Sequence, residues 1–140
     1  MISKRILTKW IKHILVKENI PDSISALNFG FFFSTTPDQY MVYCTGSKQY
    51  DKDNDDWACD EDFTPSKKYF DPGKSFSSID WRTYLTKMGE LIKNVIYKNE
   101  SLVPSSIKVI TCGFDDGDLF VVWSRGRDKS EIARIEAPKW

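Results

Sequence analysis

An acidic stretch in the middle of the chain, residues 50–63, carries the side chains best suited to chemistry or to charge-based recognition. It reads Tyr-Asp-Lys-Asp-Asn-Asp-Asp-Trp-Ala-Cys-Asp-Glu-Asp-Phe, with seven acids and one lysine, a net charge of −6. Carboxylates held close together repel by roughly 1 kcal/mol per pair in water. A cation, a basic partner or solvent must therefore relieve the repulsion.

The first possibility is a calcium site. Asp51, Asp53 and Asp55 occupy the first, third and fifth positions of a twelve-residue calcium-binding loop, and Asp62 occupies the twelfth. A loop of the helix-loop-helix type takes Gly at the sixth position and Glu at the twelfth, whereas this chain has Asp56 and Asp62. We predict no metal and no cofactor, and a calcium-dependent domain stays an alternative.

The second possibility is a protein-binding surface. Clustered carboxylates on a protein of zero net charge can mimic a nucleic-acid backbone and fill a basic active site, and charge complementarity speeds association. Trp57 is either an aromatic anchor for the partner or a plug that packs beneath a solvated loop. The predicted partner-binding residues are Asp51, Asp53, Asp55, Asp56, Trp57, Asp60, Glu61 and Asp62, with Asp115, Asp116 and Asp118 of a later turn as a second choice.

Catalytic constellations are missing from the sequence. His13 is the single histidine, and it lies among apolar positions without an acidic neighbour in sequence, which indicates a structural role. The chain contains no GxSxG, P-loop or GxGxxG motif, each of which marks a common catalytic or nucleotide site. We therefore predict no catalytic residue and no enzyme activity. A small enzyme that uses the carboxylates of residues 51–62 stays an alternative.

Length and composition predict one domain, residues 1–140, in the cytoplasm. Hydrophobic residues make up 41% of the chain and aromatic residues 14%, enough for a folded core. The zero net charge argues against direct nucleic-acid binding. Residues 1–18 are basic but periodic in their apolar positions, which favours a helix over a signal peptide. Cys44, Cys59 and Cys112 form no CxxC pair, and no apolar run reaches membrane-spanning length.

The hydrophobic pattern divides the chain into six main elements. Apolar residues at three- and four-residue spacing predict helices over 2–15 and 81–96, the second opened by a capping signal from Ser77 with Asp80. The β-branched and aromatic runs at 27–34, 40–45, 107–114 and 119–124 predict strands. Turns are expected at 36–39 and 115–118, and an irregular crossing with Tyr69 and Phe70 as anchors is expected over 64–76. The pattern at 131–136 fits a strand or a helical turn.

The order helix-strand-strand-helix-strand-strand predicts an α+β fold. Because each strand pair can form a hairpin, the simplest arrangement is an antiparallel sheet of about four to five strands with both helices on one face.

The chain also resembles the immunity proteins of contact-dependent growth inhibition and related polymorphic toxin systems of bacteria. The stretches that carry the resemblance are residues 26–30 (Ala-Leu-Asn-Phe-Gly), 46–47 (Gly-Ser), 55–59 (Asp-Asp-Trp-Ala-Cys) and 113–119 (Gly-Phe-Asp-Asp-Gly-Asp-Leu). The resemblance implies a bacterial, cytoplasmic toxin inhibitor without catalysis of its own. Its implied partner is one cognate toxin domain, often a nuclease. A protein-interaction domain without an inhibitory role stays a third alternative.

Overall fold

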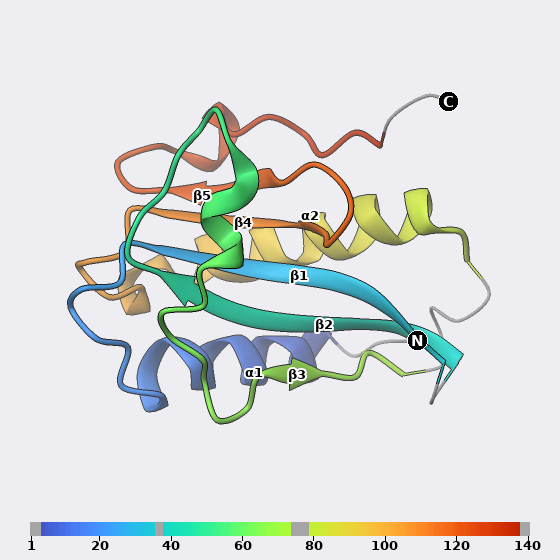
Figure 1. Ribbon diagram of the computed structural model, residues 1–140, viewed down its shortest axis with the longest axis horizontal. Helices are drawn as coiled ribbons and strands as arrows, with labels where there is room; N and C mark the ends of the chain where they lie inside the picture. Colours follow the sequence, from blue (N-terminus) through green and yellow to red (C-terminus); the bar gives the residue numbers. More distant parts are fainter. Residues whose placement is uncertain (1–3, 36–37, 74–78, 138–140) are drawn as a thin grey trace.

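A computed structural model describes residues 4–35, 38–73 and 79–137 (Figure 1). The described residues form a five-stranded sheet of order β3-β2-β1-β4-β5 and two α-helices, so the predicted α+β class is confirmed. The elements are α1 Lys4–Lys17, β1 Ala26–Thr35, β2 Asp38–Ser47, η1 Asp55–Cys59, β3 Tyr69–Phe70, α2 Trp81–Lys98, η3 Glu100–Leu102, β4 Val109–Phe114, β5 Phe120–Ser124 and η4 Lys129–Glu131.

The sheet is mixed, which corrects the prediction of a purely antiparallel sheet. β1 pairs with β2 and β4 pairs with β5 in the antiparallel sense, as the two predicted hairpins require. However, β1 and β4 run parallel, with Ala26 opposite Val109 and Phe31 opposite Phe114. The physical reason is that α2 forms a crossover that returns the chain beside β1, the strand whose first six residues are all buried.

The fifth strand is β3, which corrects the predicted element order. It comes from the segment expected to be an irregular crossing, and it pairs with β2 through Val42 and Tyr43. The chain therefore reads α1-β1-β2-β3-α2-β4-β5.

Ser77 lies outside the described residues, and the N-cap of α2 is Asp80, whose carboxylate accepts a hydrogen bond from Thr83 N at 2.7 Å. Residues 131–136 form neither predicted element beyond the end of η4.

Both helices pack on one face of the sheet, as the predicted order of helices and strand pairs suggested. Leu27, Phe29 and Phe31 of β1 point into this core with no exposed surface. Ile11 of α1 and Met88 of α2 belong to the same core cluster and are equally buried. Figure 1 shows the two helices behind the sheet and the short helix η1 in front of it.

The opposite face of the sheet is covered only in part. Trp57 of η1 packs there against Ala26 of β1 and Val109 of β4. Further along the same face, the ring of Tyr43 lies so close over Gly30 that any Cβ at that position would collide with it. Position 30 therefore requires glycine because the tyrosine ring rests on its backbone.

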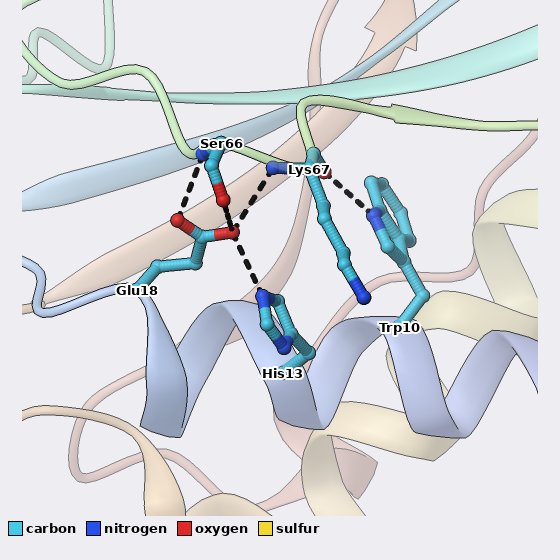
Figure 2. A network of polar contacts seen from close by, with 5 residues as sticks. All are labelled: Trp10, His13, Glu18, Ser66 and Lys67. Carbon is cyan, nitrogen blue, oxygen red and sulfur yellow. Dashed lines mark hydrogen bonds and ion pairs between the residues drawn. The ribbon is translucent and has the colours of Figure 1, made fainter.

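The connection from η1 to β3 is fastened to α1 by one carboxylate (Figure 2). Glu18 accepts hydrogen bonds from Ser66 N at 2.8 Å, Ser66 Oγ at 2.8 Å, Lys67 N at 3.0 Å and His13 Nε2 at 2.9 Å. Although desolvation opposes ionisation, these donors together lower the pKa of Glu18 to about 2. His13 thus has an acidic partner after all, which the sequence reasoning missed, and Trp10 Nε1 adds a bond to Lys67 O at 2.8 Å.

Candidate protein-binding face

Two acidic segments that lie far apart in sequence meet on the face of the sheet opposite the helices. The carboxylate of Asp55 in η1 accepts a hydrogen bond from Leu119 N at 3.0 Å, across 64 residues of sequence. Leu119 directly follows the turn at residues 115–118, which carries the second-choice acids. The first-choice and second-choice sites predicted from sequence are therefore parts of one surface.

We call this surface the acidic face. Its members are Asp51, Asp53, Asp55, Asp56, Asp60, Glu61 and Asp62 from the central segment and Asp115, Asp116 and Asp118 from the β4–β5 turn. All ten side chains belong to exposed residues. Within the described part of the chain, Glu61 is the one member with an ion pair, to Lys68 Nζ at 3.0 Å. The acidic face thus carries a large negative charge, and among the described residues Glu61 alone of its members is neutralised by an ion pair.

The central segment is held in place by hydrogen bonds to its own backbone and to β2. Asn54 caps η1 by accepting from Asp56 N at 2.9 Å, and the Ser47 hydroxyl lies 2.6 Å from Asp60 O and 3.2 Å from Trp57 O. Asp62 accepts from Lys48 N at 2.9 Å. These bonds define the backbone path of the segment despite its charge repulsion.

Trp57 is the buried side chain that packs this segment against the sheet. It is 6% exposed, and its ring meets that of Tyr50 edge-on with centroids 5.1 Å apart. In the described residues, no acceptor pairs with its Nε1 atom. A partner cannot reach a side chain so deeply covered without moving the segment, so the packing role of Trp57 is the one that the geometry favours.

The turn at 115–118 is also fixed to the sheet. The Tyr43 hydroxyl donates a hydrogen bond to the Asp115 carboxylate, and Asp115 N donates to Phe31 O at 3.3 Å. Burial and the neighbouring carboxylate both raise the pKa of Tyr43, so the phenol stays protonated and acts as a donor. Lys68 lies over the rings of Tyr43 and Tyr69, 5.6 Å and 5.3 Å from their centroids.

The calcium alternative gains no geometric support. Three of its four candidate ligands each accept a hydrogen bond from a different backbone amide: Asp51 from Asp53 N, Asp55 from Leu119 N and Asp62 from Lys48 N. Over residues 4–35, 38–73 and 79–137, no three His, Cys, Asp or Glu side chains converge as a metal site requires.

A pocket of about 790 Å³ opens beside the turn at 115–118. Its described wall is mostly aromatic, and its charged members are all acids. The lining residues are Phe31, Phe32, Phe33, Tyr40, Trp81, Leu85, Phe114, Asp115, Asp116, Gly117, Asp118 and Phe120. Sequence reasoning missed this hollow because it assigned the aromatic positions of the strands and of α2 to the core. The available signal was an aromatic-rich strand, Phe29 to Phe33, combined with an Asp-rich turn, but their proximity is not written in the sequence.

A second hollow, of about 630 Å³, lies over β4 and β5 beside Tyr50 and has the opposite charge. Among its described lining residues are four cations and one acid. They are Lys52, Lys108, Arg127 and Arg134, with Glu131. The acidic face therefore adjoins a basic groove, and the surface of the protein is divided by charge even though its net charge is zero.

Comparisons with known proteins do not assign this chain to a family. The chain matches no protein-family model, no curated protein and no solved structure. Among the described residues, neither helix has the length and apolar character needed to cross a membrane. The acidic face and the two hollows are therefore the surface features that point to a function.

Proposed function

We propose that the protein is a protein-binding inhibitor of the immunity type, which neutralises a cognate bacterial toxin domain by covering its active site with the acidic face. The observation that carries the proposal is the hydrogen bond between Asp55 and Leu119 N, because it joins two acidic segments into one surface. A nuclease domain fits this surface well, since its active site binds phosphates and is basic. The protein itself performs no catalysis in this proposal.

The charge of the acidic face supports binding rather than scaffolding. Ten carboxylates gather there, and in the described structure a single lysine, Lys68, forms an ion pair with one of them. Such an arrangement does not stabilise the free protein, because like charges repel. A basic partner would relieve the repulsion, steer the encounter and exclude partners of the wrong sign.

The rigid backing of the face supports occlusion. The central segment is fixed by Trp57, by Ser47 and by the cap at Asn54, and the turn is fixed by Tyr43. A preorganised surface loses little conformational freedom on binding, so more of the interaction energy appears as affinity. The same carboxylates on a disordered tail would bind more weakly per unit of buried area.

The direct test is copurification with a candidate toxin domain, taken first from any toxin gene that neighbours the gene of this protein. We expect a stable one-to-one complex and loss of toxin activity in it. The matched pair of variants consists of Asp56→Lys with Asp116→Lys, one position from each acidic segment, and Asp22→Lys with Glu136→Lys, two exposed acids outside the acidic face. Both pairs change the net charge by the same amount. No complex at micromolar concentration, or equal weakening by both pairs, would refute the proposal.

A further inference from the structure

The pocket beside the turn at 115–118 has walls made of aromatic rings in mutual contact. Tyr40 meets Phe33 edge-on with centroids 5.0 Å apart and Phe114 at 5.7 Å, and Trp81 meets Phe114 at 6.2 Å. Phe33 is 46% exposed, so part of this wall faces solvent in the free protein. Aromatic faces carry negative electrostatic potential and attract cations placed over them.

The rim of the pocket adds full negative charges. Asp115, Asp116 and Asp118 belong to its lining, and no lysine or arginine does among the described residues, although the Arg82 guanidinium lies 4.8 Å from the centroid of the Trp81 ring. Asp115 is engaged by the Tyr43 hydroxyl. Asp116 and Asp118 have neither an ion pair nor a side-chain hydrogen bond in the described structure, so their carboxylates are available to a ligand. A purely apolar guest would desolvate this rim without compensating it.

We propose that this pocket receives an arginine side chain presented by the partner protein. The guanidinium is planar, stacks on aromatic rings, is more weakly hydrated than an ammonium and binds carboxylates through paired N–H donors. Aromatic walls with an aspartate rim provide both kinds of contact in one hollow. The inference rests on the proposed function, since it gives the binding partner a chemistry and locates one anchor point on or beside the acidic face.

The experiment uses short peptides in place of the partner. The wild-type protein is titrated with the tripeptide amide acetyl-Gly-Arg-Gly and with the same peptide carrying citrulline, which has the shape of arginine but no charge. The signal is the indole N–H resonance of Trp81 in a two-dimensional NMR spectrum, and that of Trp123, 2% exposed and outside the pocket lining, serves as internal reference. We expect the arginine peptide to shift Trp81 with saturation and the citrulline peptide to bind about tenfold more weakly or not at all.

Two variants locate the site. Asp116→Asn with Asp118→Asn should weaken the arginine peptide about tenfold, because these changes remove charge-assisted hydrogen bonds at the rim. Asp53→Asn with Asp56→Asn removes the same charge from the central segment and should leave the peptide affinity within about twofold, because exposed charges away from the pocket are screened. All four positions are exposed, so both double variants are expected to fold, and their NMR spectra check this.

Several outcomes would overturn the inference. Equal binding of the arginine and citrulline peptides would show that charge is not recognised. A lysine peptide that binds as tightly as the arginine peptide would remove the guanidinium assignment, and a tighter leucine peptide would mark an apolar site. A shift of Trp81 with protein concentration alone would mean that a second copy fills the pocket. Any of these results leaves the copurification test untouched, so failure of the pocket and failure of the inhibitor proposal are distinguishable.

Discussion

The two acidic segments of the face differ in what lies beneath them. Residues 50–63 cover part of the sheet, and the Trp57 side chain of this segment is buried against β1 and β4. The carboxylates of Asp51, Asp55 and Asp62 accept backbone hydrogen bonds. The turn at 115–118 is fixed to the sheet through Asp115 and borders the aromatic pocket. The first segment thus combines scaffold and charge, whereas the second combines charge with a hollow that can hold a side chain.

This contrast shows that carboxylate density alone does not locate a binding site. The central segment has seven acids and attracted the sequence interpretation, while the turn has three. The contacts around each segment show the difference. The central segment offers a charged surface that can steer a partner, whereas the turn lies beside a pocket that can anchor one of the partner's side chains. Changing each region separately should therefore give different losses: stability for the buried supports of the central segment, and affinity for the turn.

Trp57→Ala should give the largest loss. Replacing a buried tryptophan by alanine typically lowers the free energy of unfolding by about 3–5 kcal/mol, because it removes packing and leaves a cavity. Urea unfolding followed by circular dichroism measures this. The comparison variant is Asp116→Asn with Asp118→Asn, expected within about 0.5 kcal/mol of wild type. Wild-type stability for Trp57→Ala would make Trp57 a surface anchor and remove the contrast between the segments.

Leu85→Ala should lose roughly 2–5 kcal/mol of unfolding free energy, because Leu85 is 3% exposed on the core side of α2. Leu85 also lines the pocket, so the variant tests whether that wall belongs to the folded core. Ile6→Ala is the matched control, since Ile6 is 58% exposed and should change stability by less than about 0.5 kcal/mol. Equal melting temperatures for the two variants would contradict the assignment of the buried helix face.

Glu18→Gln should destabilise the protein by about 2 kcal/mol at neutral pH, because it removes the charge on which four hydrogen bonds converge. The folded-state pKa of Glu18 is about 2, below its ordinary value of 4.5. Its stabilisation is therefore complete above pH 4.5 and lost as the pH falls toward 2. Unfolding curves at neutral and acidic pH should show the variant and wild type converging in acid. A constant difference across this range would exclude the carboxylate as the cause.

Calcium should have the smallest effect. Because the candidate ligands Asp51, Asp55 and Asp62 bond to separate backbone amides, we expect no binding heat and no rise in melting temperature on adding calcium or magnesium. A saturable stabilisation by calcium would restore the metal-binding alternative, since a ligand that binds the folded state raises its stability.

Local sequence patterns predicted the two α-helices and the four longer strands. The non-local features were missed. β4 pairs parallel to β1 because the chain crosses over through α2 between the two strands. The residues of the two strands do not by themselves show this pairing. β3 has two residues, too few to show the alternating hydrophobic pattern of a strand. The two acidic segments are joined by a contact between Asp55 and Leu119, which lie 64 positions apart in the sequence. The pocket is lined by aromatic residues that local sequence patterns assign to the core.

The central claim is that both acidic segments form one surface that meets a basic partner. The most direct measurement is the association rate of the toxin domain with Asp56→Lys, Asp116→Lys and with the control pair Asp22→Lys, Glu136→Lys, followed from low to high salt. Asp55 stays unchanged because its carboxylate holds Leu119 N. We predict association about tenfold slower for the first pair at low ionic strength, a difference that disappears as salt screens exposed charges, and little change for the control. Association of the first pair as fast as wild type at low salt would contradict the claim.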